Sequence, residues 1–266
     1  MVQILHFLET VDPLYVLSGV LVGGLVGMTG VGGGSLMTPI LILVFGIHPA
    51  TAVGTDLLYA SVTKASGSLV HGYNRNVEWR VVGRLASGSV PATILTVAAL
   101  YYLHIDSKMT QLIITRVLGF ALLFTAISLF MRKPLMRRYS ANVPEMDPET
   151  VRRLTVLTGV ILGVLVTLSS VGAGAIGVTA LVLLYPKMES RRIVGSDIAH
   201  AVPLTLIAGA GHWWLGSVDF HMLVSLLVGS IPGIMISSHF ASRVPDRVLR
   251  PLLAGTLAVV GGRLAF

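Results

Sequence analysis

Long runs of apolar residues alternate with short polar stretches and with clusters of Gly and Pro along the chain. Because about 20 apolar residues in a helix cross the hydrocarbon core of a bilayer, these runs predict an all-α integral membrane protein. We predict ten helical segments, at approximately 13–29, 35–45, 52–69, 81–103, 111–131, 154–168, 175–185, 196–215, 220–240 and 248–266. The second and seventh segments, at about 11 residues each, are too short to span alone as straight helices.

The sequence also repeats itself, and the two short segments fall at equivalent places in the repeat. Each follows a Gly-rich break, Gly30-Val31-Gly32-Gly33-Gly34 in the first half and Val171-Gly172-Ala173-Gly174 in the second. At an offset of 141 further residues stay in register: Gly54-Thr55-Asp56 with Gly195-Ser196-Asp197, His71 with His212, and Gly88-Ser89-Val90-Pro91 with Gly229-Ser230-Ile231-Pro232. We therefore predict two transmembrane repeats of about five segments each, at 1–131 and 154–266, joined by a linker at 132–153.

Composition and charge support a membrane protein with a defined orientation. Only 12% of the residues are charged and 54% are hydrophobic, whereas soluble domains carry about a quarter charged residues. The net charge of +7 does not indicate a nucleic-acid partner. If the chain crosses the membrane back and forth, 15 of the 19 Lys and Arg residues fall in loops on the same side of it. Cations accumulate in cytoplasmic loops, so we expect a multi-pass protein of the cell membrane with a cytoplasmic 132–153 linker. This placement also requires the two repeats to have inverted topology, as in many secondary transporters.

The Gly-rich breaks are the first candidates for a binding site. Non-helical backbone at membrane depth is tolerated only inside protein or beside a water-filled cavity. A short helix begins after each break, and a helix N-terminus offers free N–H groups to an anion. We expect the two N-termini to converge near the midplane around a small anion, although the glycines could instead serve only close helix packing, as we expect for Gly19, Gly23 and Gly27. The predicted substrate-binding residues are Gly32, Gly33, Gly34, Ser35, Thr38, Lys64, Ser170, Gly172, Ala173, Gly174 and Ala175.

Ionisable residues within the third and eighth segments are the second group of candidates. Charged groups are costly in a bilayer and usually serve ion pairs or transport pathways. We predict coupling or gating roles for Asp56, Asp197 and His200, and we expect Lys64 to attract the anion, since Thr205 stands at the equivalent position of the second repeat. His200 lies one turn from Asp197, and a buried pair of these residues could carry a proton.

Structural interpretations of the same residues stay open. Gly54-Thr55-Asp56 and Gly195-Ser196-Asp197 also resemble N-caps that open helices. His71 and His212 stand at segment ends, where we expect them at the membrane interface, and Trp79, Trp213 and Trp214 fit an aromatic belt.

Enzyme signatures are weak, and we predict that the protein is not an enzyme. Gly33-Gly34-Ser35-Leu36-Met37 begins like a nucleophile elbow but lacks its final Gly, and no zinc-protease or phosphate-loop motif is present. An intramembrane hydrolase using Ser35 or Ser170 stays as an alternative. We expect no cofactor and no metal site, and the chain has no Cys.

Three stretches resemble a known family. They are Gly27–Pro39, Ala52-Val53-Gly54-Thr55 and Asn76-Val77-Glu78-Trp79, and together they are similar to the sulfite exporter TauE/SafE family of membrane transporters. The resemblance implies transport of a sulfur-containing anion such as sulfite, sulfoacetate or thiosulfate. We therefore expect a secondary transporter that works by alternating access, with a passive anion channel as the main alternative. Coupling to protons or sodium ions, and oligomerisation, stay open.

Overall fold

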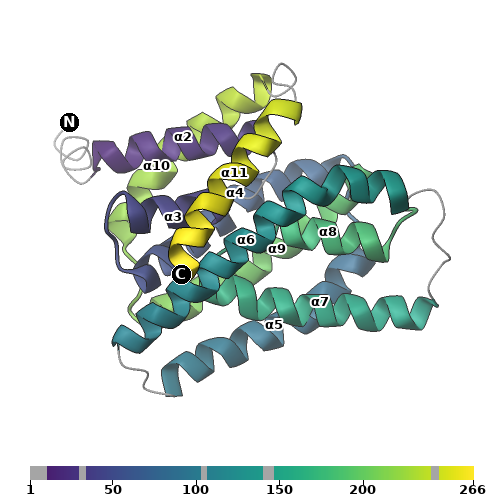
Figure 1. Cartoon of the computed structure of the whole chain (residues 1–266), viewed down its shortest axis with the longest axis horizontal. Coiled ribbons are helices and arrows are strands. Elements are labelled where there is room, and N and C mark those ends of the chain that lie inside the picture. Colours follow the sequence, from purple (N-terminus) through teal and green to yellow (C-terminus); the bar gives the residue numbers. More distant parts are fainter. Residues whose placement is uncertain (1–10, 30–33, 103–106, 140–146, 241–245) are drawn as a thin grey trace.

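The computed structural model describes residues 11–29, 34–102, 107–139, 147–240 and 246–266. Within these ranges the chain forms helices and no strands (Figure 1). The helices are α2 (Pro13–Thr29), α3 (Gly34–Leu43), α4 (Pro49–Tyr73), α5 (Trp79–Tyr102), α6 (Ser107–Tyr139), α7 (Pro148–Ser169), α8 (Ala175–Leu184), α9 (Ser190–Trp214), α10 (Phe220–Phe240) and α11 (Asp246–Ala265). Each of the ten predicted segments corresponds to one helix, so the all-α prediction is confirmed.

Several helices start earlier or end later than their apolar runs. α4 begins at Pro49, and Pro is favoured in the first helical turn because its missing N–H would have no partner there. α7 begins after Asp147, whose carboxyl group accepts hydrogen bonds from the N–H groups of Glu149 and Thr150. α7 ends at Ser169, and the next residue, Ser170, has left-handed backbone angles. α8 follows after only a few residues.

Helices of the two halves pair reciprocally. α2 packs along α10, and α5 packs along α7; in Figure 1 the first pair lies at the top of the view and the second at the bottom. The repeat relates α2 to α7 and α10 to α5, so these two pairs are equivalent. α4 packs against α9 and α6 against α11, and each of these pairs joins two equivalent helices.

Glycines set the close approach within these pairs. At seven glycines an added Cβ atom would collide with the backbone of the partner helix. They are Gly19, Gly23, Gly229 and Gly233 between α2 and α10, and Gly88, Gly159 and Gly163 between α5 and α7. The partners also match between the halves: Gly19 faces Leu226 and Ser230, and Gly159 faces Leu85 and Ser89. Close packing by small residues is thus confirmed for Gly19 and Gly23.

The direction of each pair follows from these contacts. In the α2–α10 and α5–α7 pairs the contacting residue numbers rise together, so the two helices run in the same direction. In the α4–α9 pair, Gly209 faces Leu58 and Gly67 faces Ile198, so these helices are antiparallel. Gly119 faces Ala265 and Gly261 faces Gly119 and Leu122, which makes α6 and α11 antiparallel as well.

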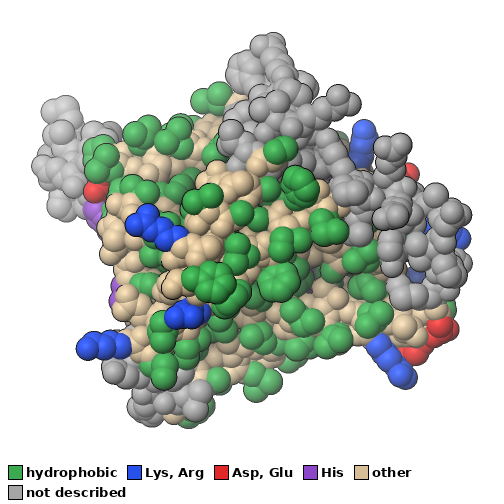
Figure 2. Space-filling model, viewed as in Figure 1, with side chains coloured by type: hydrophobic (Ala, Val, Ile, Leu, Met, Phe, Trp, Pro, Cys, Tyr) green, Lys and Arg blue, Asp and Glu red, His purple; other side chains and the backbone are tan. Residues whose placement is uncertain are grey.

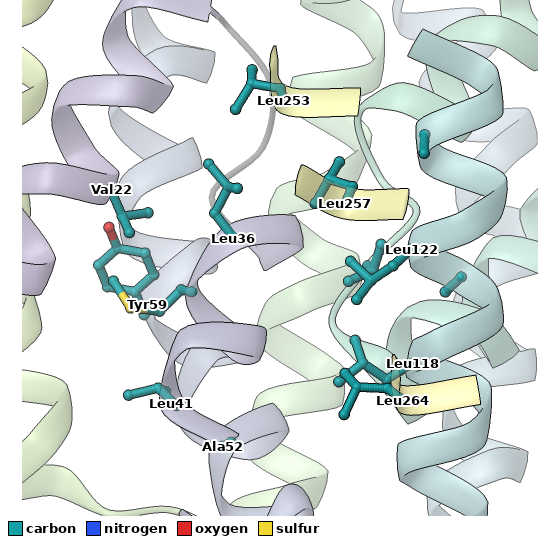
Figure 3. Packing of buried hydrophobic residues seen from close by; sticks show 14 of the residues in the cluster. Val22, Leu36, Leu41, Ala52, Tyr59, Leu118, Leu122, Leu253, Leu257 and Leu264 are labelled. Atoms are coloured by element: carbon teal, nitrogen blue, oxygen red, sulfur yellow. The ribbon is translucent and has the colours of Figure 1, made fainter. Parts of the chain in front are cut away.

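A large buried cluster lies between α2, α3, α4, α6, α10 and α11. Figure 3 shows Tyr59 of α4 near Val22 of α2, with Leu122 of α6 near Leu257 of α11. This cluster fixes α3 and α4 against helices of both halves, and α3 and α4 carry several of the candidate residues.

The outer surface is apolar, as expected for a lipid-facing protein. Hydrophobic side chains are spread over the face drawn in Figure 2, with few charged side chains between them. Large apolar side chains are exposed on several helices, and Phe124 of α6 is 63% exposed. In the described part of the chain, α5, α7, α9 and residues 108–131 of α6 are long and apolar enough to cross a membrane, and shorter apolar helices accompany them. Trp79, Trp213 and Trp214 are all exposed. The protein is therefore a multi-pass membrane protein.

Candidate functional site

Asp56 lies inside the protein on α4, next to the short helix α3. Its side chain is fully buried, and its Oδ2 atom accepts a hydrogen bond of 2.5 Å from the hydroxyl group of Thr38. Ser170, at the end of α7, lies near the same carboxyl group. In the described residues Oδ1 of Asp56 has no hydrogen-bond partner. A buried carboxyl oxygen without a partner is costly to maintain, which is typical of a functional position.

Lys64 lies two turns further along α4 and contacts the second Gly-rich break. Its Nζ atom donates a hydrogen bond of 3.1 Å to the backbone carbonyl of Ala173. It also interacts electrostatically with the carboxyl groups of Asp56 and Asp197. One cation is thus placed among two acidic groups contributed by different halves of the chain.

The second break is irregular backbone held by glycines. Gly172 and Gly174 have φ angles of 125° and 132°, which side-chain-bearing residues rarely adopt. The N–H groups of Gly177 and Val178 already bond to the carbonyls of Gly172 and Gly174. The group of this break that faces Lys64 is the backbone carbonyl of Ala173, which accepts a hydrogen bond. The first turn of α8 begins here at Ala175, as predicted.

Of the first break, the structure describes only the last residue, Gly34. Gly32 and Gly33 lie outside the described residues. Gly34 begins α3, and Ser35 in its first turn is buried. The predicted convergence of the two helix N-termini therefore stays a prediction.

The second half contributes Asp197 and His200 from α9. The Asp197 carboxyl group lies close to Gly177 of α8, and a Cβ atom there would overlap Oδ1 of Asp197 unless this side chain moved. The buried His200 ring has its Nε2 atom 2.8 Å from the hydroxyl group of Ser89 on α5. Its Nδ1 atom has no hydrogen-bond partner in the described part of the chain, so His200 is not hydrogen-bonded to Asp197.

The N-cap interpretation of the two Gly-Thr/Ser-Asp motifs is wrong. α4 begins at Pro49 and α9 at Ser190, so both motifs lie inside their helices. Their hydroxyl groups instead fix helix starts in the opposite half. Thr55 accepts a hydrogen bond of 3.0 Å from the N–H of Asp219 before α10, and Ser196 accepts one of 2.8 Å from the N–H of Glu78 before α5.

His212 is also placed differently from the prediction. It is buried, and its Nε2 atom lies 2.8 Å from the backbone carbonyl of Thr167, so it is not at the membrane interface. His71, its equivalent in the first half, is only partly buried. Ser89 was not a predicted site residue, and its contact with His200 is tertiary, so only its place in the repeated Gly-Ser-x-Pro motif marked it in the sequence.

An apolar exterior that encloses charged residues beside a break between two helices is typical of membrane transporters. The chain belongs to the sulfite exporter TauE/SafE family, whose model matches residues 15–264.

Named relatives agree with this class. The chain is 41% identical over 250 residues to the "Probable membrane transporter protein YjnA" of Bacillus subtilis, covering 94% of this chain and 98% of that protein. It is 26% identical to "Probable membrane transporter protein YdhB" of the same organism, over 95% of this chain and 100% of that protein. A protein of Methanocaldococcus jannaschii, "Probable membrane transporter protein MJ0441", is 25% identical, over 94% and 93% of the two chains. No solved structure matches significantly. The protein is a membrane transporter and not an enzyme.

Proposed function

We propose that this transporter moves a small sulfur-containing anion, of the sulfite, sulfoacetate or thiosulfate type, across the cell membrane. The observation that carries the proposal is Lys64, a cation held inside the protein by the carbonyl of Ala173 at a break between two helices. The description of the family as sulfite exporters supports the substrate class. Thr205 stands where the second half would have an equivalent of Lys64, so the positive charge is confined to one side of the site.

The anion would bind between Lys64 and the two breaks. Its other donors would be the hydroxyl groups of Thr38 and Ser170 and the backbone N–H groups around 32–35 and 172–175. Thr38 already donates to Asp56, and Ser170 lies near the same carboxyl group, so anion binding and the state of this carboxyl group would be linked. Asp56, Asp197 and His200 would serve as coupling or gating groups, with a proton or sodium ion as the coupled species.

For alternating access, one repeat would rock against the other, with the two repeats inverted in the membrane and the linker at 132–153 in the cytoplasm. The pairing of the helices supports this arrangement. Two equivalent helices that pack antiparallel, as in the α4–α9 and α6–α11 pairs, are related by a two-fold axis perpendicular to the helices. Such an axis lies in the membrane plane when the helices span it, which is the inverted-repeat geometry of many transporters.

The direction of flow follows from the membrane potential if transport is uncoupled. An inside-negative potential favours efflux of an anion by about 2.3 kcal/mol per charge per 100 mV. Uptake would require a co-transported cation.

Purified protein in proteoliposomes tests the proposal. Sulfite, thiosulfate, sulfoacetate, taurine, sulfate and acetate are offered under imposed pH and voltage gradients, and we expect saturable transport of at least one sulfur-containing anion. Lys64→Met should weaken anion binding strongly, whereas Lys108→Met removes an exposed cation at the start of α6 and should have no effect. If none of the sulfur-containing anions is transported, the proposal is wrong.

The carboxyl variants separate the alternatives. Asp56→Asn and Asp197→Asn should abolish the response to the pH or sodium gradient in a coupled carrier. A passive channel would instead give flux that does not saturate and is insensitive to both substitutions. An intramembrane hydrolase would transport no solute and would lose its activity on substitution of Ser35 or Ser170 by Ala.

A further inference from the structure

A surface groove of about 710 Å³ lies between α5 and α7, and four arginines line it: Arg80, Arg84, Arg152 and Arg153. Glu149 pairs with Arg152 at 2.8 Å and with Arg153 at 3.1 Å. Among the described residues, four arginines and no carboxylate line the groove, and Glu149 beside it offsets only part of their charge, so the groove is positive. Arginine guanidinium groups are well suited to bind the oxygens of a phosphate group.

The arginines are not needed to pack the two helices. The equivalent α2–α10 pair has the same glycine-mediated contacts as the α5–α7 pair. At the positions equivalent to the four arginines, it carries His221, Ser225, Asp12 and Pro13. The same helix pair therefore forms without a cationic cluster, and the cluster on α5 and α7 requires another explanation.

The groove joins this cationic end to an apolar wall. Arg84 donates a hydrogen bond of 3.3 Å from Nη1 to the hydroxyl group of Tyr185, which also lies 2.8 Å from the hydroxyl group of Thr155. Along α7 the lining continues with Leu157 and Val160, which are 52% and 38% exposed. One end of the groove thus suits an anionic headgroup, and the other suits a hydrocarbon chain.

We propose that this groove binds one anionic phospholipid, with its phosphate group on the arginines and an acyl chain along Leu157 and Val160. A small sulfur-containing anion has no apolar part that would cover this wall, which favours a lipid over the transported substrate. Basic pockets between transmembrane helices are a recurrent type of site for anionic lipids. The proposal does not depend on the identity of the transported substrate.

Lipid binding to the purified, delipidated protein tests the proposal. Phosphatidylglycerol and phosphatidylcholine are titrated separately, and bound lipid is counted by native mass spectrometry. We expect one phosphatidylglycerol to bind in preference to phosphatidylcholine. The double variant Arg80→Gln/Arg84→Gln leaves both Glu149 pairs intact and should lower the phosphatidylglycerol affinity by about tenfold or more. The matched control Arg75→Gln/Arg191→Gln removes two exposed arginines outside the groove and should leave the affinity unchanged.

A second measurement keeps the arginines in place in case the double variant does not fold. The chain has no Cys, so Ser87→Cys introduces a single thiol into the groove. Phosphatidylglycerol should slow its reaction with a maleimide, and phosphatidylcholine should not. Equal binding or protection by the two lipids would overturn the proposal, as would an equal loss of affinity in the control variant. Displacement of phosphatidylglycerol by sulfite would also overturn it, because the groove would then belong to the substrate pathway.

Discussion

Substituting Gly88 tests how the two halves are held together. Gly88 of α5 faces the backbone of Val156 and Val160 on α7, and a Cβ atom at Gly88 would overlap the carbonyl oxygen of Val156. Backbone atoms cannot rotate away as a side chain can, so Gly88→Ala must push the two helices apart. Gly83→Ala on the same helix is the matched control, because nothing lies within 4 Å of a Cβ atom there.

The expected magnitude follows from comparing the two alanines. Both gain the same helix propensity, so the difference between them isolates the collision, and overpacking of this kind costs about 1–3 kcal/mol. At about 2–4 °C per kcal/mol, Gly88→Ala should melt several degrees below Gly83→Ala. Tryptophan fluorescence during heating of the detergent-solubilised protein measures both melting temperatures. If the two variants melt together, the close approach of α5 and α7 described above is wrong.

Three further substitutions probe individual contacts in the same assay. Thr55→Val removes the acceptor for the N–H before α10 and should lower the free energy of unfolding by about 1 kcal/mol; a wild-type melting temperature would contradict this contact. Leu122→Ala, in the buried cluster, should lower the free energy of unfolding by about 2–5 kcal/mol. Its control, Ile127→Ala, lies on the exposed face, where lipid or detergent fills the space left by the side chain, so equal losses of stability in the two variants would contradict the assigned burial. Ser89→Ala leaves the buried ring of His200 without its hydroxyl partner and should cost about 1–3 kcal/mol, and an unchanged melting temperature would argue against this pair.

The helices could be predicted from the sequence because each contains an apolar run, but their ends could not be placed from apolarity alone. α4 extends to Pro49 and α9 to Ser190, both several residues before the first strongly apolar stretch. Proline at Pro49 was an available signal for the start of α4. With α4 beginning at Pro49, Thr55 and Asp56 lie in the second turn of the helix, so neither residue is its N-cap.

The sequence singles out candidate residues, but it does not predict their contacts. Repetition of Asp56 as Asp197, and their place within apolar segments, singled out these residues. Which groups meet them depends on how α3, α5 and α8 pack, and the sequence carries no local signal for this. The contact of Lys64 with Ala173 joins residues 109 positions apart, and that of His200 with Ser89 joins residues 111 positions apart.

The reciprocal pairing of the halves has a consequence for biosynthesis. α2 is the first described helix to emerge from the ribosome, and its partner α10 begins only at Phe220. At about 5–20 residues per second, translation of the roughly 200 residues between Gly19 and Leu226 takes on the order of 10–40 s. During this time the glycine face of α2 has no α10 to contact and must be covered by lipid or by the insertion machinery. The pair that contains α2 is thus completed only near the end of synthesis, after both members of the α5–α7 pair have been made.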